Sequence, residues 1–162
     1  MKGVDNKLQK RAYQFMLDNR TAALASSGKK GIPHVATIYF LPKKDMTLYF
    51  TTRAEGRKFT NMLNNPIVSM AINSDDSGGM VTIQLTGKVE RIEDLKEEQD
   101  ITLELWSLRY DEASWPPPPL RLYERGHADS LAVMKVTPTE MTMANFEVSD
   151  DNRYIPFFQK IV

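Results

Sequence analysis

Residues 48–66 read LYFTTRAEGRKFTNMLNNP, and this stretch decides how the rest of the chain is interpreted. A strand that ends in two threonines leads through a short turn to a Gly-Arg-Lys sequence at positions 56–58, where a helix opens. Asn65 and Pro66 end that helix, because the residue before a proline avoids the helical region. The stretch therefore predicts a strand, a tight turn and a short helix with basic residues in its first turn.

The start of this helix has the properties of an anion site. The first amides of a helix lack internal partners, and the helix dipole places partial positive charge at that end. Arg57 and Lys58 add full charges on side chains that can fold back toward Thr51 and Thr52. A phosphate monoester fits such a site, since each charge-assisted hydrogen bond contributes about 1.5–3 kcal/mol. The competing interpretation is a solvated helix start whose basic residues lie at its unfavourable end.

Strand patterns surround this stretch on both sides. Apolar and threonine-rich segments that alternate with polar turns predict hairpins. The strands are expected at residues 21–27, 33–41, 46–52, 67–73, 80–91, 131–137 and 140–146. The first three would form two successive hairpins, the next two a third, and the last two a hairpin around Pro138.

Helices complete the predicted fold. The spacing of apolar residues predicts helices at 4–18 and 93–108, in addition to the one at 56–64. Residues 110–120 contain SWPPPP, whose prolines exclude a helix interior and a central strand. The chain is therefore predicted to be mainly β, an α+β protein built as an antiparallel barrel with peripheral helices.

Composition limits the number of domains and the classes of partner. The chain has 162 residues, 41% of them hydrophobic, which suits one core, so a single domain over residues 1–162 is expected. Lys and Arg total 21 and Asp and Glu total 21, a balance that argues against nucleic acid as a partner. No stretch approaches the roughly 20 apolar residues of a membrane span. The N-terminal residues lack a signal-peptide core, so we expect a cytoplasmic protein.

Charge is segregated along the chain despite the zero balance. The first 60 residues hold 12 Lys and Arg against 4 Asp and Glu, whereas the remaining 102 hold 9 against 17. The acidic excess fits the solvated faces of the later helices. The basic excess can hold a small anionic ligand without making the whole protein basic.

The side chains present exclude several kinds of chemistry. There is no cysteine, and the two histidines, His34 and His127, have no carboxylate at ligand spacing, so no metal site is predicted. No GxSxG or GxGxxG string occurs, and SGKKG at residues 27–31 lacks the spacing of a phosphate loop. Catalytic side chains stay unassigned, and any reactive group is expected to come from an organic cofactor.

Three blocks of the sequence, in this order along the chain, resemble the pyridoxamine 5'-phosphate oxidase-like FMN-binding split-barrel family. They are GIPHVATIYF at residues 31–40, the stretch at 48–66, and VTIQLTGKVERIED at 81–94. The resemblance implies a six-stranded antiparallel split β-barrel with peripheral helices. It also implies a homodimer that binds FMN at the subunit interface.

The cofactor-binding residues implied by the resemblance are Thr37, Ile38, Tyr39, Thr51, Thr52, Arg57, Lys58, Thr82 and Gln84. The first three would offer backbone groups to the flavin ring, the two threonines of the next strand would contact it, and Arg57 and Lys58 would bind the phosphate. Thr82 stands where the oxidases have a flavin-contacting glutamine, and Gln84 shares its strand face and could supply that amide. An ordinary polar strand face is the alternative interpretation for either residue.

Departures from the family pattern narrow the implied function. Ala36 and Leu41 stand in place of an arginine and a lysine of the oxidases, Gly56 replaces the phosphate-site serine, and the C-terminal signature of the oxidases is absent. Pyridoxine phosphate oxidation is therefore not predicted. The pattern is more similar to general stress proteins and flavin-reductase-like members.

That branch implies an FMN-dependent oxidoreductase that exchanges hydride with a reduced nicotinamide or a small organic substrate. Two alternatives stay open: a non-catalytic flavin-binding stress-response protein, and a deazaflavin-dependent reductase. Trp115, in the proline-rich segment, would either cover a substrate pocket or pin its loop to the core.

Overall fold

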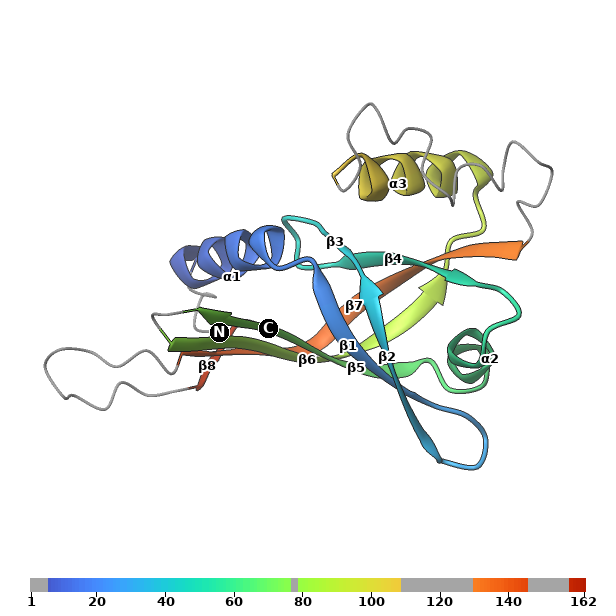
Figure 1. Ribbon diagram of the computed structural model, residues 1–162, viewed down its shortest axis with the longest axis horizontal. Helices are drawn as coiled ribbons and strands as arrows, with labels where there is room; N and C mark the ends of the chain where they lie inside the picture. The colour runs from blue at the N-terminus through green and yellow to red at the C-terminus, as the bar shows by residue number, and fades with distance from the viewer. Residues whose placement is uncertain (1–5, 77–78, 109–129, 146–157) are drawn as a thin grey trace, which may run out of the picture.

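The computed structural model describes residues 6–76, 79–108, 130–145 and 158–162. Within them, one antiparallel sheet of eight strands curls into a half-barrel with helices at its periphery (Figure 1). The elements are α1 (Asn6–Asp18), β1 (Thr21–Ser27), β2 (Pro33–Tyr39), β3 (Leu41–Pro42), β4 (Leu48–Arg53), α2 (Arg57–Asn64), β5 (Ile67–Asp76), β6 (Gly79–Arg91), α3 (Leu95–Ser107), β7 (Leu131–Asn145) and β8 (Phe158–Lys160). Six strands are long, and β3 and β8 have only 2 and 3 residues, so the predicted split barrel is confirmed.

The strand order is β2-β1-β5-β6-β7-β4-β3, with β8 paired to β7. The hairpins β1–β2 and β5–β6 are confirmed. The second predicted hairpin is shorter than expected, because only Leu41 and Pro42 pair with β4, and β2 lies at the edge of the sheet. Phe40, Leu41 and Pro42 are all buried, which breaks the alternation of a single strand and marks a bend at this point.

The predicted hairpin around Pro138 is wrong, because β7 is one strand of 15 residues that passes through this proline. Pro138 lies opposite Gly87, where the register of β6 and β7 shifts. On the other edge of β7, β4 pairs only as far as Val136 and β8 only from Thr142. Pro138 thus lies between its described neighbours on that edge, at a bulge, where a missing N–H donor is tolerated.

Two apolar clusters hold the helices to the sheet. The main core fills the concave side of the half-barrel, where α1 contributes Met16 and α2 contributes Phe59. A smaller cluster joins α3 to the opposite side of β4 and β7, so that Phe50 points into the first cluster and Tyr49 into the second. Among the described residues, no helix is long and apolar enough to cross a membrane.

Candidate functional site

Helix α2 begins without a side-chain cap. Its N-cap residue is Gly56, in an extended conformation (φ −75°, ψ 149°), and the first turn contains no acidic residue. Gly56 cannot accept a hydrogen bond from the first amides of the helix as Ser or Asp would. The positive end of the helix dipole is therefore not offset by any residue of its own first turn.

Side-chain contacts hold the second half of α2 beside the end of β1. Asn61 Nδ2 donates to Ser26 Oγ at 3.4 Å, and Asn65 Nδ2 donates to Ser27 Oγ at 2.9 Å. Phe59, two residues before Asn61, is buried in the main core. Helix α2 is consequently held against the sheet by Phe59 in its first turn and by hydrogen bonds from its second half.

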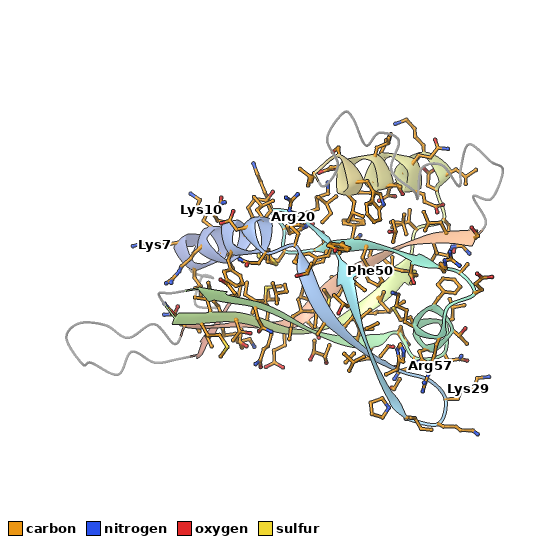
Figure 2. The ribbon with its side chains drawn as sticks, viewed as in Figure 1. Lys7, Lys10, Arg20, Lys29, Phe50 and Arg57 are labelled. Carbon is orange, nitrogen blue, oxygen red and sulfur yellow. The ribbon has the colours of Figure 1, made fainter. Side chains whose placement is uncertain are left out.

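Arg57 and Lys58 differ in their surroundings. Consecutive helical residues leave the axis about 100° apart. Arg57 is exposed and lies near the β1–β2 turn (Figure 2), whereas Lys58 is half-buried. Burial lowers the pKa of the Lys58 ammonium below its ordinary value. Neither side chain forms an ion pair with a described carboxylate, so Lys58 is a partly desolvated cation whose charge no described acidic residue balances.

Thr51 and Thr52 point to opposite faces of β4, as neighbouring strand residues must. Thr52 is 4% exposed, and its Oγ1 has no hydrogen-bond partner among the described residues. Thr51 is partly exposed on the other face. Only one of the two side chains can therefore line a given cleft, and Thr52 is the one whose hydroxyl is buried without a described partner.

The edge position of β2 decides which of its backbone groups are accessible. Phe40 N donates to Arg20 O at 3.1 Å, and the register continues without a break along β1. In an antiparallel pair, every second residue exchanges hydrogen bonds with its partner. The backbone of Ile38 therefore points at β1, and that of Thr37 points at the outer edge. The Ile38 side chain is buried in the core at 3% exposure.

Thr82 and Gln84 share a face of β6, as predicted, but differ in burial. Thr82 is 4% exposed, and its Oγ1 has no described partner, whereas Gln84 is exposed. Gln84 lies in one cross-strand row with Ala71, Ala23 and Thr37. Three strand spacings of about 4.8 Å put roughly 14 Å between Thr37 and Gln84.

Three residues of this row, Gln84, Ala71 and Ala23, line a shallow cavity of about 510 Å³ on the outer face of the sheet. Its floor is made of the small residues Ala23, Ala25 and Ala71, and Val35 at its rim is 64% exposed. A second hollow of about 260 Å³ lies where α3 meets β2, beside Arg20 and the rings of Tyr39 and Trp106, whose centroids are 6.3 Å apart.

The remaining residues singled out in the sequence are the two histidines and Trp115, together with any possible metal ligands. No group of three or more His, Asp or Glu side chains gathers as metal ligands within the residues that the structure describes. His34 Nδ1 is buried without a described partner. Trp115 and His127 lie outside the described residues.

One feature that sequence reasoning missed is the concavity between the β1–β2 turn and α2. Lys29 and Lys30 of SGKKG face Arg57 there. The sequence does indicate the helical wall of this concavity, because Arg57, Asn61 and Asn64 recur at the spacing of one helix face. The contact between turn and helix is tertiary, and no local pattern indicates it.

The curled half-barrel, with a basic helix start next to its β1–β2 turn, defines a split-barrel protein with a candidate anion site. The chain belongs to the pyridoxamine 5'-phosphate oxidase family, whose pattern matches residues 8–145. A search of curated protein sequences gives no match.

Solved structures share the fold at low sequence identity. A Listeria innocua protein named after pyridoxamine 5'-phosphate oxidase is 20% identical, with a TM-score of 0.64 over 84% of this chain and 97% of its own. An FAD-binding protein of Mesorhizobium loti is 22% identical, with a TM-score of 0.62 over 83% and 91%. The haem storage protein HutZ of Vibrio cholerae is 16% identical, with a TM-score of 0.54 over 83% and 92%. The fold thus occurs in proteins named for flavin and for haem.

Proposed function

We propose that the chain binds FMN, with the phosphate at the first turn of α2. The observation that carries this proposal is Lys58, a half-buried cation with a lowered pKa and no described carboxylate partner. A phosphate dianion there would offset the desolvation of the ammonium and accept hydrogen bonds from the uncapped amides. The unused hydroxyl of Thr52 is a further donor on the neighbouring strand.

The flavin ring would lie along the outer edge of β2. An edge strand offers backbone donors and acceptors in a row, and the groups of Thr37 point that way. Ile38 would not contact the ring through its backbone, which faces β1. Its buried side chain would instead anchor β2 in the core. Ring and phosphate sites would then both belong to elements held by the main core.

A homodimer follows if Gln84 also contacts the flavin. Gln84 lies too far from the edge of β2 to reach the same ring within one subunit, so the amide would come from a second copy. The outer face of the sheet suits such a partner, because its floor of small side chains lets another backbone approach closely. The exposed Val35 at the rim supplies apolar surface for the contact.

The proposed activity is a two-electron oxidoreduction with a reduced nicotinamide or a small organic substrate. A bound flavin supplies the hydride acceptor or donor. The chain positions it: the first turn of α2 fixes the phosphate, the edge of β2 orients the ring, and Tyr39 and Trp106 border the adjoining hollow where a planar substrate fits. No described side chain is assigned as a general acid or base.

The decisive experiment measures FMN binding by the purified protein, by visible spectrum and by the shift of Tm with added FMN. Lys58→Glu is expected to weaken FMN affinity at least about a hundredfold while leaving the circular dichroism spectrum unchanged, because it replaces a favourable charge by a repulsive one. Lys10→Glu on α1 is the control, because Lys10 is exposed at the opposite end of the molecule (Figure 2). Equal FMN affinity in wild type and Lys58→Glu would contradict the proposed phosphate site.

The alternatives are separated by the same preparation. The mass of the ligand released from the protein distinguishes FMN from a deazaflavin or a haem. Anaerobic reduction by nicotinamide cofactors, compared with free FMN, distinguishes an enzyme from a non-catalytic flavin-binding protein.

A further inference from the structure

The concavity between the β1–β2 turn and α2 has the make-up of a second anion site. It has a volume of about 250 Å³ and is lined by Lys29, Lys30, Arg57, Asn61 and Asn64, among others. Figure 2 shows Lys29 and Arg57 at the same end of the molecule, one from the turn and one from the helix. Both cationic walls therefore come from elements that the fold brings together.

The walls of this pocket are fixed by the backbone. Gly31 N donates to Gly28 O at 2.9 Å, which closes a tight turn with Lys29 and Lys30 at its tip. Gly31 has φ +69°, a conformation that favours glycine. A Cβ on Gly28 would come within 2.8 Å of Asn61 Oδ1, so the turn is seated directly on the helix.

The charges in the pocket are not balanced. Three of its lining side chains are cationic, the two asparagines are neutral, and no acidic residue lines it. Within the described part of the chain, none of the three cations forms an ion pair. The three exposed cations line one pocket, and an anion placed among them relieves the repulsion between like charges.

We propose that this pocket binds a second phosphate, so that the chain holds a flavin in a diphosphate-linked, dinucleotide form. The inference rests on the proposed function, which places the first phosphate at Lys58. Arg57 and Lys58 are consecutive residues in the first turn of α2, and Arg57 lines the pocket whereas Lys58 does not, so the two linked phosphates of a diphosphate would each meet one of these cations. A single phosphate at Lys58 leaves the three pocket cations unbalanced.

The test compares the affinities for FMN and FAD, by titration calorimetry at low salt, in three proteins. Removing both turn lysines, in Lys29→Ala/Lys30→Ala, is expected to weaken FAD binding at least about tenfold through the lost charge-assisted hydrogen bonds. The same variant is expected to change FMN affinity by less than about twofold, because exposed charges act weakly beyond their own contact. The matched control is Lys10→Ala/Lys44→Ala, which removes the same charge from another concavity and is expected to change neither affinity.

A Tm measurement with inorganic pyrophosphate and no flavin tests the pocket separately from the proposed FMN site. An unchanged ratio of FAD to FMN affinity in Lys29→Ala/Lys30→Ala overturns the inference while the FMN site stands. Failure of wild type to bind either flavin removes the proposed function. In that case a Tm increase with pyrophosphate that requires Lys29 and Lys30 supports the pocket as a diphosphate site, and an increase that does not require them overturns it.

Discussion

Replacing Gly87 by alanine is expected to destabilise the fold at the point where β6 pairs with Pro138 of β7. A Cβ at this position would lie 2.8 Å from Thr137 O, 2.9 Å from Val136 Cγ1 and 3.1 Å from Pro138 Cα. The first of these distances is about 0.6 Å short of ordinary van der Waals contact, and two of the three atoms belong to the backbone of β7. The two longest strands of the sheet must separate to admit the methyl group, so we expect a loss of about 2–3 kcal/mol of unfolding free energy.

Urea unfolding followed by circular dichroism measures this loss. Gly28→Ala is the informative comparison, because its Cβ would also meet an atom at 2.8 Å, but that atom is the side-chain oxygen of Asn61. A side-chain amide can rotate away, at the expense of its long 3.4 Å hydrogen bond to Ser26, so a loss below about 1 kcal/mol is expected there. If Gly87→Ala is as stable as wild type, the reasoning about the close approach of β6 and β7 at Gly87 is refuted. If Gly28→Ala is the more damaging of the two, the distinction between backbone and side-chain walls fails.

Three further predictions follow from the described contacts. Burial lowers the pKa of Lys58, so its ammonium loses its charge at a lower alkaline pH than an ordinary lysine. As pH rises, FMN affinity is therefore expected to fall earlier in wild type than in Lys58→Arg, as flavin fluorescence titration at several pH values will show. Identical pH profiles would exclude Lys58 as the titrating group. The Thr47 hydroxyl donates to Asp45 Oδ1 at 2.7 Å, and this hydrogen bond is the main cause that lowers the pKa of Asp45. The ionised carboxylate therefore stabilises the fold at pH values above the ordinary carboxyl pKa, and this stabilisation is lost as pH falls through the lowered pKa. Asp45→Asn, measured by urea unfolding, is expected to cost about 0.5–1 kcal/mol at neutral pH and nothing in strong acid, and an equal loss at both pH values would count against this account. Ala23→Arg, on the floor of the outer cavity, is expected to convert the proposed dimer into a monomer in light scattering without loss of strand signal; a monomeric wild type would contradict the proposed dimer, and a dimer that survives the substitution would place the interface elsewhere.

Local signals in the sequence were sufficient for the elements around the site. The strand containing Thr51 and Thr52, the turn, and the helix opened by Gly56 and stopped at Asn65 all occur, with β4 at Leu48–Arg53 where 46–52 was predicted, because each boundary depends on residues next to it in the chain. The β1–β2 and β5–β6 hairpins were equally accessible, since glycine-containing turns join strands that pair directly. The local structure of the candidate anion site therefore followed from short-range chemistry.

Features set by long-range pairing were not accessible in this way. Pro138 is a strong turn signal in isolation, yet the gap between β4 and β8 lets β7 continue through it. That the face of β4 carrying Thr52, and not the one carrying Thr51, lies against the main core follows from where the two apolar clusters pack. The meeting of Lys29 with Arg57 depends on how the hairpin folds back over α2, which no local composition encodes.

The open edge of β2 has a practical consequence for the protein without its ligand. Val35 is 64% exposed, and the backbone groups of Thr37 face outward along a strand that no described neighbour covers on that side. Such a strand is a template on which other chains can add, the first step of ordered aggregation. A ligand lying along it would act as a cap, so riboflavin supplied during expression is expected to raise the yield of dispersed protein, and stripped preparations are expected to precipitate first.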